Sequence, residues 1–171
     1  MPTVRPATEE DVADVLDVHV ASIRAFGPAT YDDEQVDAWA HRPLGVVSFR
    51  ESVRNETTDI VVAEHEGEVA GFGRVKVDDG TVTAVYVHPG HARTGVGSAL
   101  LADLESRAAA AGQATLRLRA SLNAVPFYER AGYERRQVQT HATTGGVELD
   151  VVEMEKDLSA EDAVTDAADG P

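Results

Sequence analysis

Cysteine is absent from this 171-residue sequence, and lysine is nearly absent. Without cysteine, disulfide bonds and thiolate metal sites are excluded. Lysine occurs only as Lys76 and Lys156, and the formal net charge is −15. Binding to nucleic acid or to anionic membranes relies on Lys and Arg contacts to phosphate. The sequence therefore predicts no nucleic-acid partner and no membrane partner.

Long hydrophobic runs are also missing. No apolar stretch reaches the ~20 residues that span a bilayer. The opening residues MPTVRPATEEDV contain neither an apolar signal core nor an Arg-rich presequence, so we expect a cytoplasmic location. What is present is an ordinary globular composition, 43% hydrophobic and 26% charged, in a length that fits one domain with a substantial core.

The acidity of the chain has two interpretations, and the sequence leaves both open. In one, the surface field concentrates cationic substrates such as amines. In the other, the acidic surface suits a high-salt cytoplasm and carries no information about the site. Under either interpretation, a site for an anion has to rely on local groups, above all on backbone N–H groups.

Apolar periodicity and turn residues predict an alternation of helices and strands. Strands are expected at residues 4–6, 60–64, 69–77, 81–87, 115–120, 134–140 and 147–155. Helices are expected after a Thr8 cap, after an Asp32 or Asp33 cap, and at residues 48–54, 96–111 and 123–131. The fold class is α/β (α+β), with a mixed, mainly antiparallel central sheet flanked by helices. We expect residues 1–158 to form one domain and the acidic residues 159–171 to form a disordered tail.

The most informative segment is AVYVHPGHARTGVGSALLADLE, in which a buried strand leads through a Gly-rich turn into an amphipathic helix. Glycines let the backbone approach an anion, and the free N–H groups of the first helical turn point toward it. A P-loop would need a lysine in the turn, and a dinucleotide fingerprint would need a third glycine where Leu100 stands. A phosphate or pyrophosphate cradle and a purely structural turn at Gly95 and Gly97 remain the two interpretations.

This segment resembles the central motif of the GNAT superfamily of N-acetyltransferases, in a small, single-domain prokaryotic form. In that motif a strand and a proline precede Gln/Arg-x-x-Gly-x-Gly/Ala. Gly95 and Gly97 match it, whereas Ala92 occupies the Gln/Arg position and Arg93 stands beside it. The resemblance implies that the backbone of β-strand residues Val85 and Val87 pairs with the pantetheine arm of acetyl-CoA. It also implies that one segment wraps the pyrophosphate: Arg93, Thr94, Gly95, Val96, Gly97 and Ser98.

A second block, RLRASLNAVPFYERAGYE, fits the same family, in which an Asn ends a strand and a helix carries Phe-Tyr before Gly-Phe/Tyr. The resemblance implies that Asn123 hydrogen-bonds CoA and that Tyr128 protonates the departing thiolate. A phenol with an ordinary pKa near ~10 keeps its proton at neutral pH. The competing interpretation of Tyr128 is a core aromatic residue.

By this resemblance the chain is an acyltransferase that moves the acetyl group of its co-substrate acetyl-CoA to a small-molecule or peptide amine by direct attack. Many family members carry a glutamate where Thr81 stands here. The proton acceptor is therefore open among Glu64, His65, His19, His88 and a water chain that ends at a carboxylate. The missing glutamate keeps a second hypothesis alive, a non-catalytic acyl-CoA-binding or regulatory module with the same fold.

Three further expectations concern metals, the acceptor pocket and self-association. The histidine spacing matches no metal motif, so no metal site is expected. Residues 24–54 are expected to form one wall of the acceptor pocket, with Tyr31 and Trp39 either in that wall or packed between short helices. A homodimer is left open.

Overall fold

The computed structural model describes residues 2–41, 45–143 and 145–158. Its strands are β1 Thr3–Pro6, β2 Thr58–His65, β3 Glu68–Lys76, β4 Thr81–Val87, β5 Thr115–Ser121, β6 Glu134–Ala142 and β7 Glu148–Asp157. Its α-helices are α1 Val12–Phe26, α2 Asp33–Ala40, α3 Gly45–Arg54, α4 Val96–Ala110 and α5 Val125–Arg130. Short 3₁₀ turns occupy Glu9–Asp11, Gly27–Ala29, Pro89–His91 and Leu122–Ala124.

The seven strands form one sheet in the order β1-β2-β3-β4-β5-β7-β6. Every neighbouring pair is antiparallel except β4 and β5. The link from β4 to β5 passes through α4, as a parallel connection requires. The fold class predicted from the sequence, a mixed and mainly antiparallel sheet flanked by helices, is therefore confirmed.

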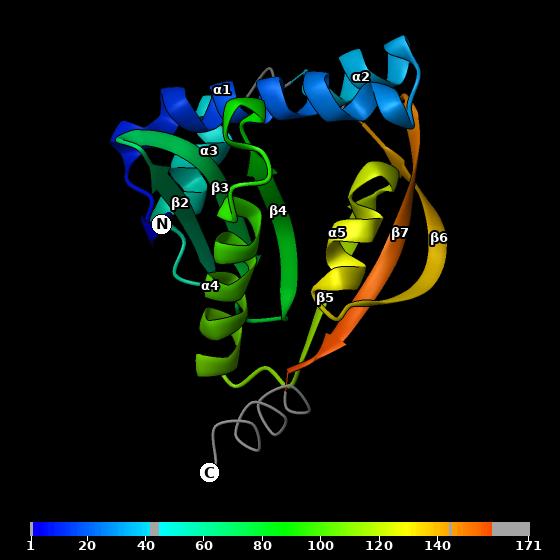
Figure 1. Cartoon of the computed structure of the whole chain (residues 1–171). Helices are drawn as coiled ribbons and strands as arrows, with labels where there is room; N and C mark the ends of the chain where they lie inside the picture. The colour runs from blue at the N-terminus through cyan, green and yellow to red at the C-terminus, as the bar shows by residue number, and fades with distance from the viewer. Residues whose placement is uncertain (1, 42–44, 144, 159–171) are drawn as a thin grey trace.

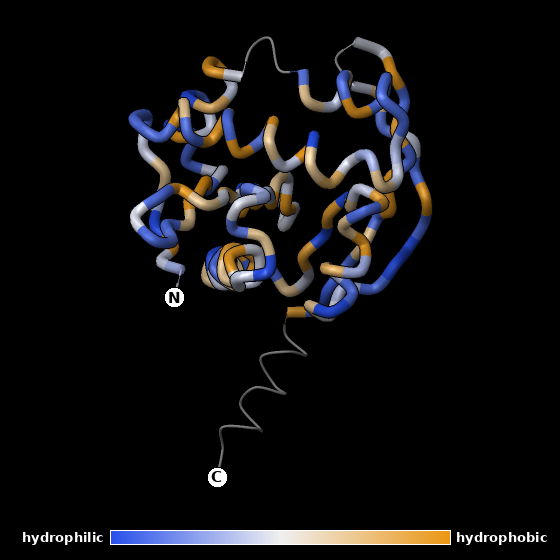
Figure 2. The backbone as a smooth tube through the Cα atoms, turned by 45° about the horizontal axis from the view of Figure 1, so that its top comes forward, coloured by the Kyte–Doolittle hydropathy of each residue, from blue (hydrophilic) through white to orange (hydrophobic). Residues whose placement is uncertain are grey.

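Helices cover both faces of the sheet (Figure 1). On one face the main core joins α4 and α5 to the strands, and its fully buried side chains include Leu100, Leu104 and Met154. On the other face α1 and α3 pack over β2, β3 and β4, while α1 and α2 reach Leu149 of β7. The edge strand β6 is mostly exposed, and in Figure 2 hydrophilic colours predominate along the rim on that side. Each face of the sheet therefore has its own core.

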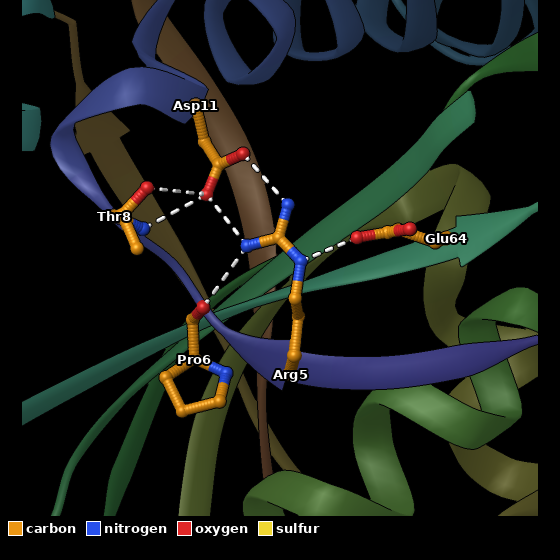
Figure 3. Close-up of polar contacts among 5 residues, drawn as sticks. All are labelled: Arg5, Pro6, Thr8, Asp11 and Glu64. Carbon is orange, nitrogen blue, oxygen red and sulfur yellow. Dashed lines mark hydrogen bonds and ion pairs between the residues drawn. The ribbon is translucent and has the colours of Figure 1, made fainter. Parts of the chain in front are cut away.

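The entry into α1 is held by a charged cluster that ties the first strand to the first helix (Figure 3). The guanidinium of Arg5 donates to both carboxylate oxygens of Asp11 at 2.9 Å, and it also pairs with Glu64 on β2. The backbone N–H of Thr8 donates to Asp11 at 2.8 Å, which completes the helix start predicted at Thr8. The hydrogen bonds from Arg5 lower the pKa of Asp11 below its ordinary value.

Most element boundaries fall within three residues of those expected from the sequence. The cap of α2 is Asp32, whose carboxylate accepts from the Gln35 N–H at 2.8 Å. The helix expected at residues 123–131 begins instead with a 3₁₀ turn, and α5 covers only Val125–Arg130. The expected tail at residues 159–171 lies outside the described residues. Among the described helices, none combines the length and the hydropathy needed to cross a bilayer.

Candidate active site

The sheet opens between β4 and β5. These parallel strands are paired only at Thr81 with Arg117 and at Val82 with Leu118, and beyond them no described residue of β5 pairs with β4. A bulge lies next to this point, because Arg74 faces Ala84 and the next residue of β3 faces Val82. Thr83 is therefore the extra residue on β4, and a bulge of this kind bends a strand and redirects its side chains. The C-terminal half of β4 is left with backbone groups that can pair with an extended ligand.

The Gly-rich turn lies at the end of β4 and leads into α4. Arg93 and Gly95 both have left-handed backbone conformations, with φ of 62° and 86°. Thr94 donates its hydroxyl to the carbonyl of His91, which ties the turn to the preceding loop. Among the described residues, no hydrogen bond is donated by the backbone N–H groups of residues 94–98. Because a helix start leaves such groups without partners and the helix dipole adds positive potential, this turn can bind an anion.

Three segments meet closely at Gly97. A Cβ placed on this residue would lie 3.2 Å from the ring of Phe127 and 3.5 Å from a methyl of Val87. The start of α4, the end of β4 and helix α5 are therefore in direct contact, as the two motif blocks require. Nearby along the chain, the side-chain oxygen of Asn123 is buried and has no hydrogen-bond partner among the described residues. A buried acceptor of this kind indicates an absent donor, and the amides of a pantetheine arm are suitable donors.

Tyr128 lies in the main core and is only 6% exposed. Its ring contacts those of Phe127 and Tyr133, with centroids 5.1 and 5.8 Å away. Burial, and to a lesser degree Tyr86 of β4, raise the pKa of the Tyr128 phenol, so the group keeps its proton at neutral pH. The structure thus places Tyr128 as a core aromatic residue that is also close to β4, and the two interpretations of this residue are compatible.

A cavity of about 720 Å³ lies on the opposite side of the β4–β5 opening. Its lining side chains come from α2, β3, β4, β5, β6 and β7, and they include Tyr31 and Trp39. Tyr31 also has a structural role, because its hydroxyl accepts from the Leu122 N–H at 3.0 Å and donates to the Asp150 carbonyl at 2.7 Å. Tyr31 and Trp39 therefore line a cavity, and Tyr31 is at the same time part of the packing between elements.

None of the four side chains proposed as proton acceptors lines this cavity. Glu64 pairs with Arg5, His65 contacts His91, and the His88 ring accepts from the Gly90 N–H. His19 is buried and packs its ring on Tyr86, 4.8 Å between centroids. The carboxylate, histidine and arginine side chains that do line the cavity are Glu153, His41, His141 and three arginines. Sequence reasoning missed them because they are far apart along the chain and belong to no motif.

One group of side chains has the composition of a metal site. His65, Glu66 and His91 each offer a ligand atom, and these atoms lie within 4.8 Å of one another. The two Nδ1 atoms are 3.1 Å apart, and Nε2 of His91 contacts Glu68 at 3.1 Å. The same contacts describe a hydrogen-bonded pair of histidines. The expectation that the protein uses no metal stays a prediction, since it rested on spacing along the chain and this group joins separate segments.

Comparison with protein families and solved structures agrees with this geometry. A family model described as "Acetyltransferase (GNAT) domain" matches residues 28–158. The crystal structure of a GCN5-related N-acetyltransferase from Rhodopseudomonas palustris superimposes with a TM-score of 0.83 at 30% identity, over 92% of this chain and 96% of that one. PaiA N-acetyltransferase from Thermoplasma acidophilum, solved in complex with coenzyme A, shares the fold with a TM-score of 0.72 at 19% identity, over 92% of this chain and 99% of that one.

A curated relative, the uncharacterized N-acetyltransferase YjcF of Bacillus subtilis (strain 168), is 37% identical over 84 residues. That match covers 48% of this chain and spans 60% of the relative's length.

Proposed function

Because this chain belongs to the GNAT acetyltransferase family, as the match over residues 28–158 shows, we propose that it transfers the acetyl group of acetyl-CoA to a primary amine within a ternary complex. The expectation of an acyltransferase is confirmed at the level of the family. The residues that bind acetyl-CoA, the residue that protonates the thiolate and the class of acceptor are the content of the proposal.

The observation that carries the proposal is the opening between β4 and β5. Two paired positions are followed by a free strand edge, and the N–H groups of residues 94–98 lie where that edge ends. An extended pantetheine arm can pair with the backbone at Val85 and Val87, while its pyrophosphate meets the start of α4. The buried oxygen of Asn123 gains a donor from the arm. The residues present therefore fit acetyl-CoA.

The chemistry follows from this placement. The nitrogen lone pair of the neutral amine attacks the thioester carbonyl carbon, and the N–H near Val87 stabilises the negative charge that develops on the carbonyl oxygen. The C–S bond then breaks, and the phenol of Tyr128 donates its proton to the departing thiolate. Water in the open cavity accepts the proton that the amine loses, and Tyr128 is reprotonated from the same solvent. The products are free CoA and an N-acetylated amine.

Two measurements test this function. Calorimetry with CoA and acetyl-CoA measures cofactor binding, and a thiol-release assay with a panel of primary amines measures turnover. We expect micromolar binding and amine-dependent thiol release that yields one acetylated amine per thiol. Absence of CoA binding would contradict the proposal entirely. Tight binding without turnover on any amine would instead support the non-catalytic acyl-CoA-binding module.

A further inference from the structure

The cavity has a charge opposite to that of the chain as a whole. The protein carries 30 acidic and 15 basic residues. The described residues that line the cavity nevertheless include Arg74, Arg117 and Arg119 and a single carboxylate, Glu153. An acidic protein that gathers three arginines around the opening of its sheet creates a local positive potential. This distribution contrasts with the hypothesis that the protein's charge attracts cationic substrates to the site.

The side chains of Arg117 and Arg119 are not bound by the carboxylates of the neighbouring strand. They lie two residues apart on the exposed face of β5, so their Cα atoms are about 7 Å apart on the same side of the sheet. The antiparallel register places Glu155 opposite Arg117 and Glu153 opposite Arg119. Cross-strand partners of this kind normally form ion pairs. Here the guanidinium group of neither arginine forms an ion pair or a hydrogen bond with any residue that the structure describes.

The side chains of β6 explain why these pairs are missing. Arg136 binds Glu155 at 3.0 Å, and Gln137 and Gln139 donate to Glu153 at 2.9 and 3.0 Å. Both carboxylates are therefore engaged from the other side of β7. The two guanidinium groups of β5 keep their donors for a ligand in the cavity.

Arg74 completes the positive lining from the other side of the opening. Its Nε donates to the hydroxyl of Thr83 at 2.8 Å, and a terminal nitrogen lies 3.4 Å from the Ser52 hydroxyl. The bulge at Thr83 thus helps to hold this side chain at the cavity. Arginine binds carboxylates and phosphates through paired N–H donors, which a fixed fork favours.

We propose that the acceptor of this enzyme is an amine that also bears an oxyanion, a carboxylate or a phosphate, which is bound by Arg117 and Arg119 with Arg74 at the opposite wall. The proposal rests on the function proposed above and names its substrate class. The acetyl group arrives through the β4–β5 opening from the α4 side, and the oxyanion anchors the acceptor on the cavity side, with the amine directed toward the opening. A strongly acidic surface elsewhere on the protein then has no part in selecting the substrate.

The test compares acceptors that differ only in their charged group. One set contains 4-aminobutyrate, its methyl ester and butylamine; another contains O-phosphoethanolamine and ethanolamine; putrescine represents a cationic acceptor. We expect kcat/KM for the anionic members to exceed that of their neutral partners by at least about tenfold, and putrescine to be the poorest. The preference between the two anionic acceptors distinguishes a carboxylate from a phosphate. Equal kcat/KM across charge classes, or a preference for putrescine, would overturn the proposal.

Substitution of the arginines tests whether they cause the preference for anionic acceptors. In Arg117→Gln/Arg119→Gln we expect the ratio of anionic to neutral kcat/KM to fall to about one, mainly through KM of the acceptor. Arg119→Lys keeps the charge but not the paired donors, so its ratio should lie in between. Arg50→Gln on the exposed face of α3 removes the same charge away from the cavity and should keep the parent ratio. A parent ratio in the double variant would overturn the assignment to these residues.

Failure of the substrate class and failure of the function give different results. Turnover without a preference for anionic acceptors leaves the function intact and overturns the inference. If no amine is acetylated, inorganic phosphate and 4-aminobutyrate are titrated by calorimetry into the parent and into the double variant. Saturable binding lost only in the double variant would support the anion site without the reaction, and the absence of binding would overturn it.

Discussion

The two sides of the β4–β5 opening are built in different ways. On the α4 side, one continuous segment, residues 93–98, presents backbone N–H groups at a helix start. On the cavity side, side chains from β3, β5 and β7 supply the charges. A ligand held by backbone groups is insensitive to most substitutions except those that change chain conformation, whereas a ligand held by side chains can change with a single residue. In the function that we propose, acetyl-CoA binds on the first side and the acceptor is selected on the second.

The largest expected effect tests the chemical step apart from ligand binding by backbone groups and by side chains. Tyr128→Phe removes the hydroxyl that we propose as the proton donor, so we expect kcat to fall by about 10²–10⁴-fold while KM for acetyl-CoA changes little. Because the pKa of this phenol is raised, the parent should lose no activity through its ionisation until the pH exceeds ~10. Steady-state kinetics across pH 6–10 measures both quantities.

Tyr133→Phe is the matched control for this substitution. It removes a phenolic hydroxyl from the same core, one that donates to Glu105 at 2.8 Å, and it should reduce stability without lowering kcat. An equal loss of kcat in both variants would show that Tyr128 acts only through packing.

The next largest effect tests the backbone groups on the α4 side of the opening and leaves the side chains of the cavity unchanged. Gly97→Val places methyl groups against Phe127, which a Cβ already approaches to 3.2 Å, and this would push α5 away from the start of α4. Since interiors yield little to extra volume, we expect CoA affinity to fall by roughly 10–100-fold. Calorimetry with CoA measures the change. Gly145→Ala is the control and should keep the parent affinity, because a Cβ there meets no atom within 4 Å. Parent affinity for CoA in Gly97→Val would contradict binding of the pyrophosphate at this turn.

A smaller effect concerns the stability of the fold and should leave both sides of the β4–β5 opening intact. Asp11→Asn weakens the charged hydrogen bonds from Arg5, so the free energy of unfolding should fall by about 1–3 kcal/mol at neutral pH, with KM values unchanged. Because the pKa of Asp11 is lowered in the fold, this stabilisation is full above the ordinary carboxyl pKa of ~4 and is lost as the pH falls through the lowered value. Urea unfolding at several pH values measures it. The exposed Asp14→Asn is the control, and an undiminished difference at low pH would contradict the argument.

The smallest effect distinguishes the contribution of the backbone from that of the Arg93 side chain to anion binding at the Gly-rich turn. Arg93 is a non-glycine residue in the left-handed region, which carries a strain of ~1 kcal/mol or more. Arg93→Gly should therefore raise stability by up to ~1 kcal/mol and, if the guanidinium contacts the pyrophosphate, weaken CoA binding by a few-fold. Thermal unfolding and calorimetry measure the two changes. An undiminished affinity would show that the backbone alone binds the anion.

Much of the fold could be read from local patterns. Strand β4 has the predicted limits because Gly80 and Pro89 bound it. Thr8 caps the 3₁₀ turn that leads into α1, and Asp32, one of the two residues expected to cap α2, is its cap. The start of α3 at Gly45 was not predicted, because no capping residue marks it in the sequence. The 3₁₀ turn before α5 was not predicted either, because the sequence between the Asn and the Pro was interpreted as part of the helix. The insertion of β7 between β5 and β6 also has no local signal, because strand order is set by long-range pairing.

The sequence by itself determined the Gly-rich helix start, because the conformation and the free N–H groups of this turn depend on the few residues around Gly95 and Gly97. It also determined the enzyme family, through two motif blocks in the correct order. Only the tertiary structure decided the charge of the cavity that we propose for the acceptor. Whether Arg117 and Arg119 are available depends on β6 residues that engage the opposing carboxylates of β7, and that competition exists only once three strands are paired side by side.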